Sequence, residues 1–125
     1  FRLDPAMNSN IRDWVEEMLE KKIIRPSRSP FNAPCMMVPK KDGGWRMVVD
    51  FRQLNKYIPH DPYPLPNINT ALASIGADGT KAKIFSVVDL LWGFYHITIQ
   101  EADRQKTAFT TPIGRYEYTR LPMGM

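Results

Sequence analysis

The stretch MMVPKKDGGWRMVVDFR, residues 36–52, decides the fold of this chain because it predicts a β-hairpin. Two apolar runs flank the turn KDGG, in which Asp42 and Gly43 supply the positive φ values that tight hairpin turns need. Because side chains alternate along a strand, we expect one face to pack and the other to be available for chemistry. The packing face would hold Trp45, Met47, Val49 and Phe51, and the open face would hold Arg46, Val48, Asp50 and Arg52.

Patterns on either side of the hairpin predict further elements. Apolar residues at three- and four-residue spacing predict an amphipathic helix from about Asn8 to Lys22. The proline-rich run RPSRSPFNAP then predicts an ordered extended connection. After the hairpin we expect a helix over 67–75 that stops at Gly76, a surface loop over 76–83, a buried strand over 84–88, strands over 95–100, 106–111 and 116–120, and a hairpin turn at Ile113-Gly114.

Composition is typical of a soluble globular segment. The 125 residues are 43% hydrophobic and contain no apolar run near 18 residues, so no membrane-spanning helix is predicted. The first residues lack the basic-then-apolar organisation of a signal peptide. The single cysteine, Cys35, has no partner for an internal disulfide and is predicted to be a small core residue.

Charge is distributed unevenly along the sequence. The net charge is +4, but residues 21–56 hold nine Lys and Arg against two Asp, which leaves that stretch at +7 and the remainder at −3. This asymmetry favours a protein that grips a polyanion with one part and handles metal ions with another. A solvated basic face is the alternative that charge alone leaves open.

Two groups of residues are candidates for chemistry. Asp89 follows a strongly apolar run, and carboxylates at strand ends are usual ligands for the divalent ions of nucleotidyl transfer. An aspartate at such a place also commonly caps the next turn. Lys40, Lys41 and Arg46 flank the hairpin turn, where cations can lie over a triphosphate, although hairpin tips are also charged for solubility.

Six runs occur in the order and near the spacing of one enzyme family. They are IIRPSRSPFNAP, VPKKDGGWRMVVDFRQLNK, DPYPLPNI, FSVVDLLWGFYHI, KTAFTTPIGRYEY and LPMGM, and they cover essentially the whole chain. On these runs the sequence resembles the reverse transcriptases of gypsy-class LTR retrotransposons and is similar to retroviral and caulimovirus enzymes. The resemblance implies an α+β fold with an antiparallel sheet and flanking helices. Residues 1–83 would form a fingers-type segment, and residues 84–125 would begin a palm.

The resemblance implies a role for each candidate residue. Asp89 would be the first catalytic aspartate, a ligand to two Mg²⁺ or Mn²⁺ ions, and the backbone carbonyl of Leu90 would complete one metal shell. Phe94 would lie under the nucleotide sugar, where a ring leaves no volume for a 2′-hydroxyl and so favours dNTP over rNTP. The other implied nucleotide-binding residues are Lys40 or Lys41 and Arg46 at the triphosphate, Val48 near the templating base and Met123 at the side of the pocket.

Further positions carry structural expectations from the same resemblance. Trp45, Asp50, Arg52 and Asn55 would hold the fingers together, with Asp50 and Arg52 forming an ion pair. At three places the sequence departs from the family pattern. Gypsy-type enzymes usually have a basic and then a small residue where Leu91 and Trp92 stand, the GADGTKAK loop is longer than usual, and Met123 replaces the commoner Phe or Gln.

The sequence stops before the Tyr-x-Asp-Asp motif that supplies the other two catalytic aspartates of the family. Because each divalent ion needs several oxygen ligands, we expect this segment alone to be inactive. The implied partners are an RNA or DNA template-primer, dNTP, and the remaining palm, thumb and RNase H parts of a Pol polyprotein, with no membrane. The implied location is cytoplasmic, in a retroelement particle, with a nuclear phase.

Three functions therefore compete at this point. The leading one is an RNA-directed DNA polymerase of which these residues are a part. The second is a decayed or domesticated remnant that binds nucleic acid through its basic fingers without chemistry. The third is a fold that serves only as a protein-docking surface, which predicts no nucleic-acid binding even at low salt.

Overall fold

The computed structural model describes residues 5–41, 43–60, 62–75, 77 and 83–125. The chain divides into two compact units. The packed unit comprises Phe1–Ile58 and Trp92–Met125, and the extended unit comprises Pro59–Leu91. The predicted boundary between fingers and palm, at residues 83 and 84, is a different division and stays a prediction.

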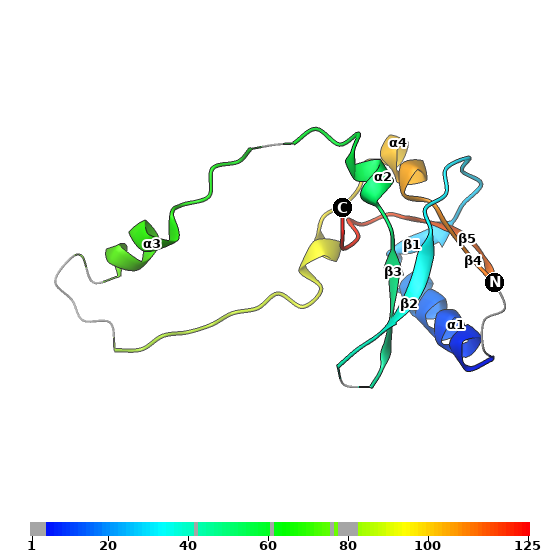
Figure 1. The fold of residues 1–125 in the computed structure, drawn as a ribbon, viewed down its shortest axis with the longest axis horizontal. Helices are drawn as coiled ribbons and strands as arrows, with labels where there is room; N and C mark the ends of the chain where they lie inside the picture. The colour runs from blue at the N-terminus through cyan, green and yellow to red at the C-terminus, as the bar shows by residue number, and fades with distance from the viewer. Residues whose placement is uncertain (1–4, 42, 61, 76, 78–82) are drawn as a thin grey trace. The chain divides into compact units, whose positions relative to one another are not determined.

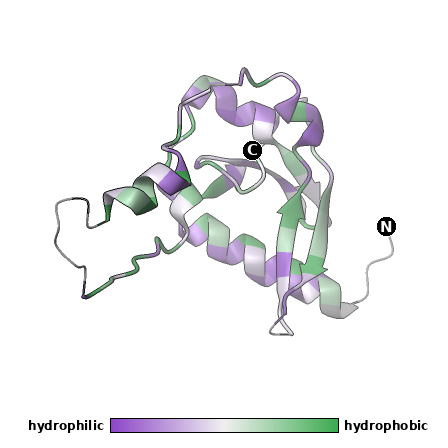
Figure 2. Ribbon diagram, turned by 60° about the vertical axis from the view of Figure 1, so that its left-hand side comes forward, coloured by the Kyte–Doolittle hydropathy of each residue, from purple (hydrophilic) through white to green (hydrophobic). Residues whose placement is uncertain are grey.

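The packed unit combines one long helix with a three-stranded antiparallel sheet (Figure 1). Helix α1 (Pro5–Glu20) confirms the predicted amphipathic helix and begins a few residues earlier. It alternates between hydrophobic and hydrophilic residues along its length (Figure 2). The sheet has the order β1-β5-β4, with β1 (Ile24–Pro26), β4 (Phe109–Thr111) and β5 (Gly114–Tyr118). The strand β1 was not predicted, because three residues ending in proline carry no alternation.

The predicted hairpin is confirmed as a two-stranded antiparallel ribbon. Strands β2 (Cys35–Pro39) and β3 (Trp45–Val49) pair with Met36 opposite Val48 and Val38 opposite Arg46. Gly43 has a φ of +83°, the left-handed region that the turn sequence predicted, while Asp42 lies outside the described residues. The face assignment holds for Val49 and Phe51, which are buried, and for Arg46 and Arg52, which are exposed. It is wrong for Trp45, which is 40% exposed because it lies next to the turn, at the end of β3 away from the core.

The core of the packed unit is an apolar cluster under α1 and the sheet. Phe109 is fully buried at its centre and makes ring contacts with Trp14, Tyr116 and Tyr118 at centroid distances of 5.2–6.2 Å. Cys35 packs against the edge of this cluster as predicted, and burial raises the pKa of its thiol. The buried members are Ile11, Val15, Met18, Ile23, Ile24, Val49, Phe51, Ile99, Phe109, Tyr116 and Tyr118.

A charged network crosses the sheet beside this core. Glu117 on β5 lies opposite Arg25 on β1, and its carboxylate accepts hydrogen bonds from Arg25 Nε at 2.8 Å and from the Ser27 hydroxyl. The same guanidinium contacts Glu101 at 2.5 Å, which lowers the pKa of that carboxyl. Glu117 is only 5% exposed, so these partners compensate the cost of burying its charge.

Short helical turns replace part of the strand pattern predicted for the C-terminal third. The strand expected over 95–100 is wrong in its first half, because residues Gly93–His96 form a 3-10 turn, η1, and only a bridge from Thr98 to Arg120 follows. The strand expected over 106–111 is reduced to β4, since α4 (Glu101–Arg104) and the turn η2 (Gln105–Thr107) precede it. The predicted hairpin turn at Ile113-Gly114 joins β4 to β5.

The extended unit contains one short helix, α3 (Ile68–Ser74), capped by the Asn67 side chain, which accepts a hydrogen bond from the Asn69 amide at 2.8 Å. The predicted helix is thus confirmed, while its expected stop at Gly76 lies outside the described residues. The buried strand predicted over 84–88 is wrong, because these residues pair with no described strand and Val87 is 95% exposed. An apolar run becomes a buried strand only where a neighbouring strand supplies hydrogen bonds and a packing face.

Together the described residues form an α+β fold, as predicted. In this part of the chain, every helix is too short or too polar to cross a membrane.

Candidate active site

The tip of the β2–β3 ribbon presents three exposed cations. Lys40 and Lys41 begin the turn, and Arg46 follows it one residue into β3. The turn is closed by a hydrogen bond from the Lys40 amide to the Gly44 carbonyl at 2.7 Å and by one from the Gly43 amide to the Lys40 carbonyl at 3.2 Å. None of the ion pairs between described residues involves these cations. Among the described residues, the tip therefore offers positive charge to an anionic ligand.

The open face of the ribbon continues from this charge to a small apolar patch. Val48 is half-buried and pairs with Met36, a residue that is 55% exposed. Beyond them, Arg52 binds both carboxylate oxygens of Asp50 at 2.7–3.1 Å, which confirms the predicted ion pair. This pair lowers the pKa of Asp50 to about 2, chiefly through the side-chain hydrogen bonds from Arg52.

Phe94 lies on the exposed side of the η1 turn. Its neighbour Tyr95 points into the core cluster, and burial raises the pKa of the Tyr95 hydroxyl. Phe94 itself is 48% exposed, and its carbonyl accepts a hydrogen bond from the Ile97 amide at 3.2 Å. Two adjacent aromatic rings of this turn therefore have different surroundings. Tyr95 packs against the core and anchors the backbone, whereas Phe94 is available to a ligand.

Met123 follows residues 119–121, which are hydrogen-bonded to residues 97–99, the segment after η1. The Leu121 amide donates to the Ile97 carbonyl at 2.9 Å, and Pro122 is fully buried, whereas Met123 is 62% exposed. The Asn55 amide nitrogen donates to the Gly124 carbonyl at 2.8 Å, and Gly124 has a φ of +98° that favours glycine. These bonds bring the Phe94 turn, Met123 and helix α2 (Arg52–Asn55) into one part of the packed unit.

Asp89 and Leu90 belong to the extended unit, where both side chains are exposed and the backbone forms neither helix nor strand. Within the described part of the chain, no group of three or more His, Cys, Asp or Glu residues is placed to hold a metal ion. One carboxylate and one carbonyl do not complete the shell of a Mg²⁺ ion, which requires about six oxygen ligands. The described residues alone therefore do not fit the two-ion site that the resemblance implied.

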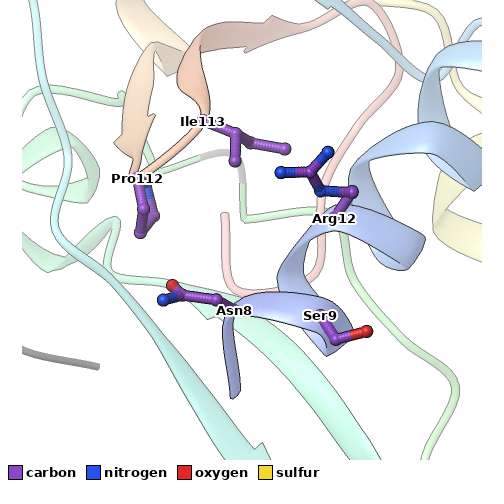
Figure 3. A pocket seen from close by; sticks show the side chains of 5 residues that line it. All are labelled: Asn8, Ser9, Arg12, Pro112 and Ile113. Atoms are coloured by element: carbon purple, nitrogen blue, oxygen red, sulfur yellow. The ribbon is translucent and has the colours of Figure 1, made fainter. Parts of the chain in front are cut away.

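A pocket of about 400 Å³ lies elsewhere, between α1 and the β4–β5 turn (Figure 3). Its described lining is Asn8, Ser9, Arg12, Pro112 and Ile113, so it includes none of the predicted site residues. The predicted site residues of the packed unit instead lie at its surface, on the ribbon, the η1 turn and the Met123 segment.

Comparison with known proteins identifies the family. The family model described as reverse transcriptase (RNA-dependent DNA polymerase) matches residues 38–125. The chain belongs to this family. Its matching range includes the basic tip, Asp89, Phe94 and Met123, although the match by itself assigns no role to any of them.

Curated relatives of this reverse transcriptase sequence are retrotransposon polyproteins. The chain is 45% identical over 124 residues to the retrovirus-related Pol polyprotein from transposon opus and 42% identical over 121 residues to that from transposon gypsy, both of Drosophila melanogaster. It is 38% identical over 125 residues to the transposon Tf2-3 polyprotein of Schizosaccharomyces pombe. These alignments cover 92–100% of the chain but only 9–12% of the relatives, so the chain spans about a tenth of their length.

Solved structures show the same fold. A prototype foamy virus protease–reverse transcriptase mutant superposes with a TM-score of 0.82 at 33% identity, covering the whole chain and 16% of that protein. The foamy viral protease–reverse transcriptase in complex with an RNA/DNA hybrid superposes with a TM-score of 0.74 at 26% identity, covering 100% of this chain and 16% of that one. The reverse transcriptase fold predicted from the six sequence runs is therefore confirmed.

Sequence reasoning missed the contacts that hold the η1 turn. Trp92, noted only as a departure from the family pattern, lies under the Lys21 ammonium, whose nitrogen is 3.7 Å from the ring centroid. The hydrogen bond from Asn55 to Gly124 was not predicted either. Both contacts join residues about 70 positions apart, so local patterns could not reveal them.

Proposed function

We propose that these residues are the fingers and the beginning of the palm of a gypsy-class reverse transcriptase, acting as part of a longer Pol polyprotein that copies RNA into DNA. The observation that carries this proposal is agreement over the whole chain with the foamy virus enzyme, together with the retrotransposon relatives. The exposed basic tip supports it, on a ribbon whose other face packs against the core at Met47 and Val49, because such a surface suits a polyanionic substrate.

In this proposal the ribbon binds the incoming nucleotide from one side. Lys40 or Lys41 and Arg46 hold its triphosphate, for which a guanidinium offers two parallel hydrogen bonds and an ammonium offers a point charge. Val48, on the same face as Arg46, packs near the templating base. The exposure of the three cations supports this role, since each can reach a ligand without first breaking a described ion pair.

The η1 turn and the Met123 segment contact the nucleotide on its other sides. The exposed Phe94 ring lies under the sugar and excludes a 2′-hydroxyl by steric contact, which selects dNTP over rNTP. Met123 closes the pocket laterally with a flexible apolar side chain. Their proximity within the packed unit, through the Ile97–Leu121 hydrogen bond, supports a shared pocket.

Asp89 and the Leu90 carbonyl would contribute the first oxygen ligands for divalent ions, Mg²⁺ or Mn²⁺, and the remaining carboxylates would come from a Tyr-x-Asp-Asp motif elsewhere in the longer protein. When bound, the ions supply Lewis-acid chemistry for nucleotidyl transfer. The exposure of the apolar run before Asp89 supports this arrangement. Residues 84–88 would become a strand when the rest of the palm provides a neighbour.

The template-primer is the partner for the open face, and the thumb and RNase H parts complete the protein. The solved foamy viral structures in complex with double-stranded DNA and with an RNA/DNA hybrid support this choice of ligand. The proposed location is a cytoplasmic retroelement particle, followed by a nuclear phase.

Primer extension tests the proposal. The full-length polyprotein-derived enzyme should extend a DNA primer on an RNA template, and Asp89→Asn should lower kcat by at least about a thousandfold because it removes a charged ligand. Asp103→Asn is the matched control, since Asp103 pairs with Lys106 on an exposed helical turn and should leave extension unchanged. Equal activity of wild type and Asp89→Asn would contradict the catalytic role of Asp89.

The uneven charge favours a second candidate, a nucleic-acid-binding remnant without chemistry. Under that alternative the full-length protein would bind template-primer with an affinity that falls steeply with salt, yet would extend no primer. The same pair of measurements therefore separates the two functions, and absence of binding at low salt would leave the docking-surface alternative.

A further inference from the structure

The η1 turn that carries Phe94 begins with an unusual backbone conformation. Trp92 has φ 56° and ψ 40°, the left-handed region that bulky side chains rarely adopt. The other non-glycine residue with positive φ in the described chain is Lys22, where it is explained by the end of α1: the Lys22 and Ile23 amides close that helix onto the Leu19 and Met18 carbonyls. Trp92 ends no helix, so a different set of contacts must hold it.

Two side chains hold the Trp92 ring. The Lys21 ammonium lies 3.7 Å from the ring centroid, and the Tyr95 ring makes a T-shaped contact with the Trp92 ring, with centroids 6.0 Å apart and planes at 88°. The backbone of Lys21 is set by the end of α1, which Lys21 follows directly; its pair with Glu17, one turn earlier, is an exposed surface pair. The Lys21–Trp92–Tyr95 stack therefore connects the end of α1 to the start of η1.

Two members of the stack, Trp92 and Tyr95, lie on either side of Phe94 along the backbone. The Tyr95 amide donates to the Trp92 carbonyl at 2.9 Å, which closes the turn around residues 93 and 94. Tyr95 packs against the core while Phe94 points outward with half of its surface exposed. Because the residues on both sides of this turn are anchored, the position of the Phe94 ring depends on the stack.

We infer that the Lys21–Trp92–Tyr95 stack is a specificity-determining device, in which Lys21 and Trp92 act as positioning residues that hold Phe94 against the sugar of the incoming nucleotide. This inference rests on the proposed function, because it needs a polymerase in which Phe94 contacts the sugar. A ring held a short distance away from its correct place still permits dNTP to bind, but it leaves space for the 2′-hydroxyl of an rNTP.

The decisive measurement is the ratio of kcat/KM for dNTP to kcat/KM for the matching rNTP, in the full-length enzyme. Lys21→Met keeps the length of the side chain and removes its charge, and we expect the ratio to fall by about tenfold, mainly through improved use of rNTP. Lys21→Arg should keep the ratio near that of the wild type, because a guanidinium also stacks on an indole. Glu17→Gln is the matched control: it removes the ion pair but leaves the ammonium over the ring, so the ratio should not change.

Two substitutions of Trp92 separate the ring from the backbone. Glycine adopts the left-handed conformation freely, whereas alanine does not, so Trp92→Gly should keep the melting temperature better than Trp92→Ala. Both lose the stack, and both should lower the dNTP-to-rNTP ratio. If Trp92→Gly keeps its melting temperature and still has a lower dNTP-to-rNTP ratio, general destabilisation does not explain the loss of selectivity.

Phe94→Ala distinguishes failure of this inference from failure of the proposed function. If Phe94→Ala relaxes the ratio while Lys21→Met and Trp92→Gly leave it unchanged, the positioning role is overturned and the polymerase proposal stands. If Phe94→Ala leaves the ratio unchanged, the sugar contact is wrong and the device has nothing to position. If the wild type extends no primer, both proposals are overturned.

Discussion

Two residues, one in each unit, show opposite relations between polarity and burial. In the packed unit Glu117, a charged residue, is 5% exposed, whereas in the extended unit Val87, an aliphatic residue, is 95% exposed. Glu117 lies on β5, which has a strand on each side, and Val87 lies in a run that pairs with no described strand. The difference teaches that available partners, rather than hydropathy alone, decide which segments of this chain are buried.

The sharpest way to break this comparison is to make one substitution in both units. Phe109→Ala in the packed unit should lower the free energy of unfolding of the 125-residue chain by about 3–5 kcal/mol, because it empties the centre of the aromatic cluster. Phe85→Ala in the extended unit removes the same kind of ring from a residue that is 73% exposed. It should change the free energy of unfolding by less than about 0.5 kcal/mol.

Urea denaturation followed by circular dichroism measures both values. Similar destabilisation by the two substitutions would show that residues 84–88 are packed in solution, and the contrast between the units would then be wrong. In the longer protein, where we propose a neighbouring strand, Phe85→Ala should become more costly.

A second substitution pair compares two carboxylates that share one partner. Glu117→Gln should lower the free energy of unfolding by about 1–3 kcal/mol, because the buried site loses a charge that accepts hydrogen bonds from Arg25 and Ser27. Glu101→Gln removes an exposed carboxylate that contacts the same guanidinium and should have a much smaller effect. Equal effects, measured by urea denaturation at pH 7, would mean that the shared arginine matters and the burial does not.

Local sequence signals predicted much of the fold, and their failures have a common cause. The ribbon, α1 and α3 follow from turn residues and helical patterns that act within a few positions. Strand β1 was missed because only its partner β5, some 90 residues later, makes it a strand. The strand predicted over 84–88 failed for the converse reason, since its apolar residues lack a described partner.

The candidate site divides in the same way. The exposed cations at the ribbon tip were predicted from a local turn pattern, and the structure places them as expected. The roles of Asp89, Phe94 and Met123 came from the family resemblance, and they stay predictions. The contacts of Trp92 with Lys21 and of Asn55 with Gly124 depend on tertiary packing, for which a single sequence carries no signal.

The smallest expected effect sharpens the comparison at the surface of the packed unit. Arg52 is 85% exposed at its side chain, yet it binds both oxygens of Asp50 and lowers the pKa of Asp50 from 3.8 to about 2. Because the pKa is lowered on folding, the pair stabilises the folded state above pH 4, and this contribution is lost as the pH falls from about 4 towards 2. NMR titration of the Asp50 carboxyl should show this low pKa, and Arg52→Ala should return it towards 3.8.

Arg46→Ala is the matched control, since it removes an exposed arginine on the same face that does not bind Asp50, and should leave the pKa low. An Asp50 pKa near 3.8 in the wild type would mean that Asp50 and Arg52 are not paired in solution. Packing would then hold the backbone of the ribbon in place, while the charged side chains on its surface would stay free to move.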